Sequence, residues 1–211
     1  PPKGEFAYGL HSNIITLFQL ERLLDKDGPT QGRLIIGGSI PKRLAFILCV
    51  GSRNTTPNSK NYCSRMCCTS TLVNAIKIKE RYPFIDVYIL YQDINTYGND
   101  ESLYEQAGEK LIKFVKFEDP PVVDIGPEGI VIEVREVTIQ EEISIPVDAI
   151  VLSVGMVPRR DITDLISINR VSCGAEGFLR EAHLKLNPVE APTSGIFLAG
   201  AVTGPKNIIE S

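Results

Sequence analysis

The run Arg43-Leu44-Ala45-Phe46-Ile47-Leu48-Cys49-Val50-Gly51 gives the strongest indication of the fold. It is a short, continuous apolar segment with a cationic residue before it and a glycine after it. Such a run favours a strand that is buried on both faces, as in a parallel sheet covered by other layers. We therefore predict a buried strand over residues 44–50.

The sequence after this strand alternates between helical and strand patterns. Residues 63–81 carry apolar side chains at helical spacing, and residues 86–91 form a second apolar run. A further helix is predicted from a cap at Asn99 or Asp100 to about residue 114. Strand, helix, strand and helix in succession are typical of parallel α/β units.

Residues 130–146 change in character and read as two alternating strands of an antiparallel β-meander. Apolar residues then predict strands over 147–154 and 194–200. On the amino-terminal side, we predict an amphipathic helix over 14–26 and a linker rich in glycine and proline over 28–42. The predicted fold class is α/β, a Rossmann-like parallel sheet with an antiparallel β-meander.

Composition excludes several classes of protein. The chain has 211 residues, of which 43% are hydrophobic and 23% charged, and its net charge is −4. This balance argues against nucleic-acid binding, which usually needs a basic surface. No apolar run reaches the roughly 18–20 residues of a membrane-spanning helix, so we expect no integral membrane protein. The chain opens on Pro1 without Met and ends at Ser211, and we expect a piece of a longer chain.

Four of the five cysteines are close in sequence and are the candidate site. Cys49 lies at the carboxyl end of the predicted strand, where ligands bind in open α/β sheets. Cys63 and Cys67 would share one face of the predicted helix, with Cys68 beside them. A helix amino terminus favours thiolates, and four thiolates suit a cubane iron–sulfur cluster.

The spacing of these cysteines leaves other interpretations open. It matches neither the common ferredoxin run nor the paired cysteines of a zinc ribbon. Zinc, a redox disulfide from Cys63 to Cys67 or Cys68, and plain buried thiols are the alternatives. We assign no role to Cys173, and a structural role is favoured for His183. Clustered cysteines of this kind indicate a reducing compartment, the cytoplasm.

Motifs for nucleotide binding and for acid–base catalysis are missing. No G-x-G-x-x-G occurs, and the turn after the predicted strand reads Gly51-Ser52-Arg53-Asn54. We therefore do not expect NAD in its usual seat, and we identify no catalytic residues. Arg53 and Arg65 flank the cysteines and either offset the negative charge of a cluster or lie solvated on the surface.

Several segments together resemble the A subunit of heterodisulfide reductase. They are Arg43 to Arg53, Asn61-Tyr62-Cys63-Ser64-Arg65-Met66-Cys67-Cys68, Gly195 to Ile208, Glu181 to Leu186, and Tyr8 to Glu21. The cysteine block is specific to that family, whereas the last segment is shared more widely among flavin disulfide-reductase-like proteins. The resemblance covers nearly the whole chain.

The resemblance implies a segment of an iron–sulfur flavoprotein with a thioredoxin-reductase-like core. It implies a [4Fe-4S] cluster on Cys49, Cys63, Cys67 and Cys68, and an FAD site with Gly200, Ala201, Pro205 and Lys206 near it in the intact protein. It divides the chain into a flavin-domain segment with linker (1–39), a Rossmann-like domain with the cysteines (40–155), and a return to a split FAD-binding domain (156–211).

In that family, electrons pass between hydrogenase or formate dehydrogenase, ferredoxin and the other heterodisulfide reductase subunits, and this chain would take part in that electron transfer. Two rival functions remain: a binding or scaffold module with structural zinc or no metal, and a pyridine-nucleotide disulfide reductase-like domain.

This chain departs from the family pattern in two ways. It lacks the FAD fingerprint and the ferredoxin-type cysteine runs that the full-length family members carry. Ala201 also stands where related flavoproteins often carry an aspartate that holds the ribityl chain. We therefore expect the chain alone to bind FAD weakly or not at all and not to turn over by itself.

Overall fold

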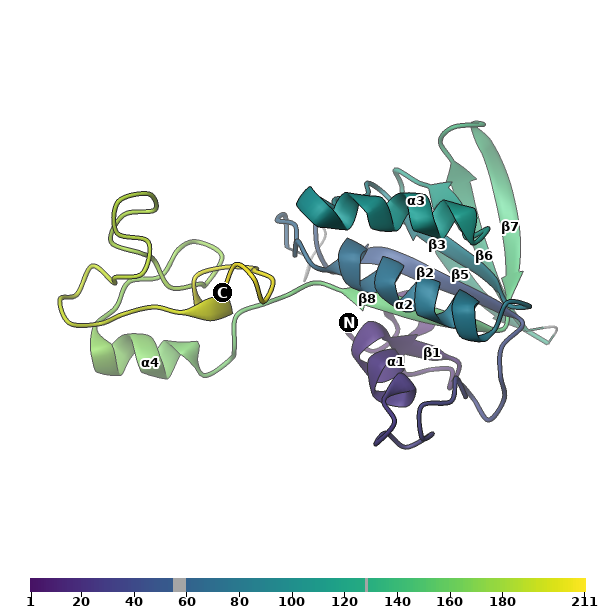
Figure 1. Cartoon of the computed structure of the whole chain (residues 1–211), viewed down its shortest axis with the longest axis horizontal. Helices are drawn as coiled ribbons and strands as arrows, with labels where there is room; N and C mark the ends of the chain where they lie inside the picture. The colour runs from purple at the N-terminus through teal and green to yellow at the C-terminus, as the bar shows by residue number, and fades with distance from the viewer. Residues whose placement is uncertain (55–59, 128) are drawn as a thin grey trace. The chain divides into compact units, whose positions relative to one another are not determined.

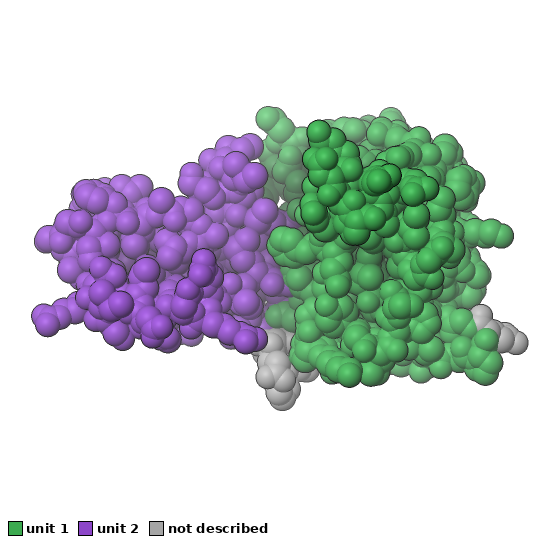
Figure 2. Space-filling view, turned by 90° about the horizontal axis from the view of Figure 1, so that it is seen from below, with its two compact units in different colours: residues 1–51, 67–154 green, residues 52–66, 155–211 purple. Residues whose placement is uncertain are grey.

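The computed structural model describes residues 1–54, 60–127 and 129–211. The chain forms two compact units (Figure 2). Unit 1 comprises residues 1–51 and 67–154, and unit 2 comprises residues 52–66 and 155–211. Among the described residues, no helix is long and apolar enough to cross a membrane.

Unit 1 is built on a five-stranded sheet in the order β1-β8-β2-β3-β4, in which all neighbouring strands are parallel. The strands are β1 (Ile14–Thr16), β2 (Arg43–Val50), β3 (Asp86–Tyr91), β4 (Lys113–Lys116) and β8 (Ala149–Val154). Every residue of β2 after Arg43 is buried, which confirms the predicted strand. The strands predicted over 86–91 and 147–154 are also present as β3 and β8.

The two faces of β2 enter two different cores because side chains alternate along a strand. Phe46 and Leu48 join the core formed with α1 (Leu17–Leu24) and α2 (Cys67–Arg81). Ala45 and Ile47 join the core formed with the antiparallel strands. The parallel sheet is thus the middle layer, and α1, α2 and α3 (Ser102–Glu109) cover one face (Figure 1).

The predicted meander is confirmed as a three-stranded antiparallel sheet in the order β5-β6-β7. Its strands are β5 (Val122–Gly126), β6 (Gly129–Glu136) and β7 (Glu141–Val147). Ile132 of β6 faces Ile145 of β7, and both are buried. The sequence pattern did not indicate β5, because most of its side chains are exposed and carry no alternating apolar signal.

The predicted helix over 14–26 is wrong at its start. Residues 14–16 form β1, which pairs with β8, and α1 begins only at Leu17. Thr16 caps the helix: its hydroxyl accepts the Gln19 N–H at 3.3 Å, and its own N–H donates to Gln19 Oε1 at 2.7 Å. This reciprocal capping box fixes the helix start, and the apolar periodicity of the segment hid the short strand.

The third predicted helix is also too long. After the 3-10 turn η2 (Gly98–Glu101), α3 ends at Glu109, and residues 113–116 form the edge strand β4 beside β3. The predicted linker over 28–42 contributes the buried side chains Leu34 and Ile36 to the helix-side core. A segment rich in turns can still bury isolated apolar residues between its glycines.

Unit 2 has little regular structure. It contains α4 (Ile162–Asn169) and the 3-10 turn η3 (Gly200–Val202), and its buried core is Val171, Leu179, Ala191 and Leu198. The strand predicted over 194–200 is reduced to one bridge between Phe197 and Glu190. A turn at Ser194-Gly195 leaves too few residues to form a ladder before η3 begins. The predicted assignment of 1–39 and 156–211 to a split flavin domain stays a prediction.

Candidate functional site

Cys49 lies where β2 reaches the carboxyl edge of the parallel sheet. The residue is buried, and its φ of 60° lies in the left-handed region. The pairing of β2 with β8 is irregular between Ile47 and Val50, which marks a bulge at this point. A non-glycine residue in this conformation costs roughly 1–3 kcal/mol, so the surrounding packing must hold Cys49 in place.

The helix that follows starts later than predicted. Because α2 begins at Cys67, residue 63 precedes it, and Cys63 and Cys67 do not share a helix face. Cys67 and Cys68 are the first two residues of α2, and both are buried. Backbone N–H groups in the first turn of a helix lack partners within the helix, and this end favours negative charge.

The Cys68 sulfur contacts the loop that follows β3. It accepts a hydrogen bond from the backbone N–H of Asn95 at 3.4 Å. The Cys68 thiol also donates to the carbonyl oxygen of Asp93 at 3.7 Å. Cys68 therefore lies beyond the carboxyl end of β3, while Cys49 lies at that of the neighbouring strand β2. Unit 1 brings both cysteines to the sheet edge where open α/β sheets bind ligands.

A buried pair of hydroxyls connects the start of α2 to the sheet. Thr71 and Ser153 of β8 share a hydrogen bond of 2.9 Å, and the Ser153 hydroxyl lies 3.4 Å from the carbonyl of Cys67. Sequence reasoning missed both residues. Ser153 interrupts the apolar run of β8, and a polar residue within such a run is the sequence signal that could have identified it.

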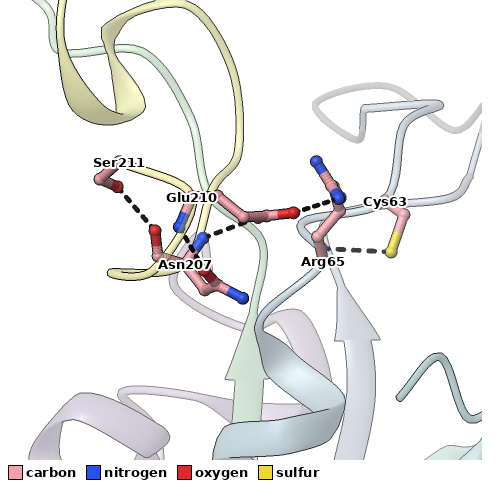
Figure 3. A network of polar contacts seen from close by, with 5 residues as sticks. All are labelled: Cys63, Arg65, Asn207, Glu210 and Ser211. Atoms are coloured by element: carbon pink, nitrogen blue, oxygen red, sulfur yellow. Dashed lines mark hydrogen bonds and ion pairs between the residues drawn. The ribbon is translucent and has the colours of Figure 1, made fainter. Parts of the chain in front are cut away.

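Unit 2 contains Cys63 in the loop before α2. The sulfur of Cys63, which is half-buried, accepts the backbone N–H of Arg65 at 3.2 Å (Figure 3). Arg65 has a φ of 59°, and its guanidinium pairs with Glu210 at 2.5 Å. An ion pair thus connects this loop to the last residues of the chain.

The neighbours of Cys63 bind the segment that follows β8. Ser64 Oγ accepts the N–H of Met156 at 2.7 Å, and the Tyr62 hydroxyl donates to the carbonyl of Met156 at 3.0 Å. Burial, followed by the nearby charge of Glu176, raises the pKa of Tyr62, so the phenol keeps its proton and remains a donor. A Cβ at Gly155 would lie 3.0 Å from Ser52 Cβ and 3.2 Å from Ser64 Oγ, so a larger residue here would have to displace these side chains slightly.

Two observations bear on whether the residues fit a cluster. The sulfurs of Cys63 and Cys68 each accept a backbone N–H, as sulfurs of iron–sulfur centres do. Ser52 Oγ is buried without a hydrogen-bond partner among the described residues. An orphaned buried hydroxyl costs about 1–3 kcal/mol, which a further polar group beside it would remove. Both features fit an electron-rich group.

The four cysteines belong to different units: Cys49, Cys67 and Cys68 to unit 1, and Cys63 to unit 2. Within residues 1–54, 60–127 and 129–211, no three His, Cys, Asp or Glu side chains form a group that could hold a metal ion. The four-ligand cluster therefore stays a prediction. Cys173, to which we assigned no role, is exposed in unit 2.

The residues expected near FAD lie around η3 in unit 2. Gly200 begins η3 with a φ of 68°, and Lys206 Nζ donates to Thr203 Oγ1 at 2.6 Å. Ala201 is exposed, while Pro205 is half-buried. Ala201 borders a cavity of about 470 Å³ lined by Met156, Val157, Pro158, Arg159, Asp161, Ile162, Leu165, Phe178, Ala201 and Val202. This cavity is mostly apolar, with the ion pair of Arg159 and Asp161 (2.6 Å) beside it.

Comparison with known proteins identifies relatives along almost the whole chain, although no family profile matches. The chain is 38% identical over 215 residues to an iron–sulfur A subunit of the CoB-CoM heterodisulfide reductase of Methanopyrus kandleri, a match to 99% of this chain and 32% of that protein. It is related to the A subunit of heterodisulfide reductase. The match to the A subunit of the H2:CoB-CoM heterodisulfide,ferredoxin reductase of Methanothermobacter marburgensis is 39% over 210 residues, or 98% of this chain and 32% of that protein.

This heterodisulfide reductase A-like chain thus spans about a third of the length of the curated relatives it matches. Among solved structures, it is similar to T. acidophilum thioredoxin reductase with a TM-score of 0.57 at 15% identity, covering 96% of this chain and 53% of that one. At this identity the likeness concerns the fold alone. It confirms the predicted α/β class with a thioredoxin-reductase-like architecture.

Proposed function

We propose that this chain is an electron-transfer segment of a heterodisulfide reductase A-type iron–sulfur flavoprotein, with Cys49, Cys63, Cys67 and Cys68 as ligands of a [4Fe-4S] cluster. The observation that carries the proposal is the pair of backbone N–H bonds to the Cys63 and Cys68 sulfurs, in a chain related to iron–sulfur subunits. A cluster on these thiolates would accept and release one electron at a time.

Three of the proposed ligands lie in unit 1, at or next to one edge of its parallel sheet. Cys49 is the next-to-last residue of β2, Cys67 begins α2, and Cys68 contacts the loop after β3. Because only three residues separate Cys63 from Cys67, backbone connectivity keeps their α-carbons within about 14 Å. Ligation by all four cysteines requires their sulfurs to converge, because no three His, Cys, Asp or Glu side chains of the described residues already form such a group.

We further propose that Gly200, Ala201, Pro205 and Lys206 contribute one wall of an FAD site in the intact protein. The cavity beside Ala201 supports this, because its lining is mostly apolar and a flavin ring needs an apolar seat with a few polar groups. In this role, η3 would present its backbone to the flavin, and Lys206 would supply a positive charge.

The proposed partners follow from the names of the related proteins. Those names describe reductases that use H2, formate or ferredoxin with the CoB-CoM heterodisulfide. We propose the corresponding partners here: the other heterodisulfide reductase subunits, ferredoxin, and a hydrogenase or formate dehydrogenase. A cluster needs cysteines that are not oxidised to disulfides, and we propose a cytoplasmic location because that compartment is reducing.

The test is anaerobic purification of the whole chain, followed by quantification of iron, zinc and acid-labile sulfide. We expect about four irons and four sulfides per chain and a broad visible absorption that bleaches with dithionite. The double change Cys67→Ser and Cys68→Ser should abolish both signals. Cys173→Ser is the matched control, because that cysteine is exposed and is no proposed ligand.

Other outcomes separate the rival functions. Stoichiometric zinc without iron would support a structural zinc module. A dithiol that cycles with a disulfide, with no metal bound even after anaerobic reconstitution, would support a disulfide reductase-like domain. Unchanged iron in the Cys67→Ser/Cys68→Ser chain would refute the ligand assignment.

A further inference from the structure

The carboxylate of Glu210 is held from two sides within unit 2 (Figure 3). Its Oε1 binds the guanidinium of Arg65 at 2.5 Å, and its Oε2 accepts the backbone N–H of Asn207 at 3.1 Å. The N–H of Glu210 donates to Asn207 Oδ1 at 2.8 Å. This reciprocal arrangement is a capping box between residues 207 and 210, which fixes the orientation of the carboxylate.

Arg65 in turn adopts a backbone conformation that a non-glycine residue avoids. Its φ of 59° is in the left-handed region, where the Cβ approaches the following carbonyl. In this conformation the N–H of Arg65 points at the Cys63 sulfur, 3.2 Å away. Such a conformation persists only where the surroundings fix it, and the charge-assisted ion pair with Glu210 is one contact that holds the Arg65 side chain.

We infer that Glu210 is a positioning residue for Cys63. Through its ion pair with Arg65, it holds the Arg65 N–H against the Cys63 sulfur, and so it connects the cysteine loop to the segment after the proposed flavin wall. The side chains of Arg65 and Glu210 are 43% and 26% exposed, so solvent screens this pair less than a fully exposed one. The effect of these contacts on a bound cluster rests on the proposed function. Their effect on the conformation of the Cys63 loop is independent of it.

The consequence for a cluster has a definite sign. Hydrogen bonds to cysteine sulfur stabilise the reduced, more negative state and therefore raise the reduction potential. The positive charge of Arg65 acts in the same direction, and Glu210 offsets part of it. Loss of the N–H donor together with the guanidinium should therefore lower the potential more than loss of the guanidinium alone.

Two substitutions at one position separate these contributions. Arg65→Gly removes the guanidinium but retains the left-handed backbone, because glycine accepts a positive φ without steric cost. Arg65→Ala removes the guanidinium and also favours relaxation of the backbone. Glu210→Gln removes the negative charge of the ion pair and keeps the size of the side chain. Glu190→Gln is the matched control, since it neutralises a carboxylate that contacts the Asn187 side chain in the same unit.

The first measurement is amide hydrogen exchange at position 65 by NMR in the metal-free whole chain. We expect protection to fall on the order of tenfold in Glu210→Gln and Arg65→Ala, the loss of about one hydrogen bond. Protection should be intermediate in Arg65→Gly and unchanged in Glu190→Gln. Circular dichroism confirms that each variant is folded.

The second measurement is the reduction potential of the iron-loaded chain. We expect the most negative potential in Arg65→Ala, an intermediate one in Arg65→Gly, and the highest of the three in the parent. Equal protection at position 65 in Glu210→Gln and the parent would overturn the inference, as would identical behaviour of the two Arg65 variants. If the parent binds no iron, the proposed cluster fails, and hydrogen exchange alone then tests the role of Glu210.

Discussion

The cysteines of the two units are held by different kinds of structure. Cys67 and Cys68 of unit 1 belong to a helix that packs on a parallel sheet, and the buried pair of Thr71 and Ser153 fixes its start. Cys63 of unit 2 lies in a loop, where its sulfur accepts the N–H of Arg65, and the buried apolar core of that unit has four residues. Secondary structure distributes the effect of a mutation over many contacts, whereas a loop depends on each hydrogen bond.

The largest difference between the units should appear when their cores are truncated. Phe46 is fully buried in β2, and Phe46→Ala should lower the free energy of unfolding of unit 1 by about 3–5 kcal/mol. Leu198→Ala in the small core of unit 2 should affect unit 2 alone. Urea denaturation monitored by hydrogen exchange distinguishes the unfolding of unit 1 from that of unit 2. A single transition that both variants shift equally would contradict independent cores.

The next effect concerns the start of α2. Ser153→Ala removes the partner of the buried Thr71 hydroxyl and should cost about 1–3 kcal/mol. Thr71→Val combined with Ser153→Ala should cost less than the sum of the single changes, because no hydroxyl is then left unpaired. A double-mutant cycle by chemical denaturation measures this coupling, and additive costs would show that the pair is unimportant.

A similar loss of stability is expected on substitution of Gly155 in unit 2, which lies close to the side chains of Ser52 and Ser64. The added methyl of Gly155→Ala would meet Ser52 Cβ at 3.0 Å, and such overpacking typically costs about 1–3 kcal/mol. Gly126→Ala is the control, because a Cβ there meets nothing within 4 Å. Thermal unfolding of both variants gives the comparison; equal stability would mean that the loop yields freely.

The smallest effect is electrostatic and lies in unit 1. Burial raises the pKa of Asp148, but hydrogen bonds from the backbone N–H groups of Arg43 and Lys42 and the ion pair with Arg43 outweigh it, so the pKa of this carboxyl is lowered. The carboxylate therefore stabilises the fold above the unfolded pKa of about 3.9, and the contribution is lost as the pH falls through the folded pKa.

Because a third of the Asp148 side chain is exposed, Asp148→Asn should cost less than about 1 kcal/mol at pH 7. The difference from the parent should shrink as the pH approaches the folded pKa. Urea unfolding at several pH values measures it, and a difference that persists unchanged in acid would point to the shape of the side chain rather than its charge.

Elements with one dominant local signal were predictable, and elements made by pairing were not. The apolar run of β2 and the alternation of β6 and β7 carry their own patterns, and the structure contains all three strands. β1 and β4 are three and four residues long and exist because β8 and β3 offer them hydrogen bonds. Helical periodicity in the flanking residues concealed both strands.

At the candidate site, the sequence identified the four cysteines and placed Cys49 at the end of a buried strand, because residue type and local apolar pattern suffice for that. It misplaced Cys63 on a helix, since cysteine spacing cannot tell a first helical turn from a loop. The contacts that fix these residues join positions far apart in the chain, such as Ser153 with Thr71 and Glu210 with Arg65. Such pairs form only when the chain folds, because no local propensity brings a carboxylate to a guanidinium 145 residues away.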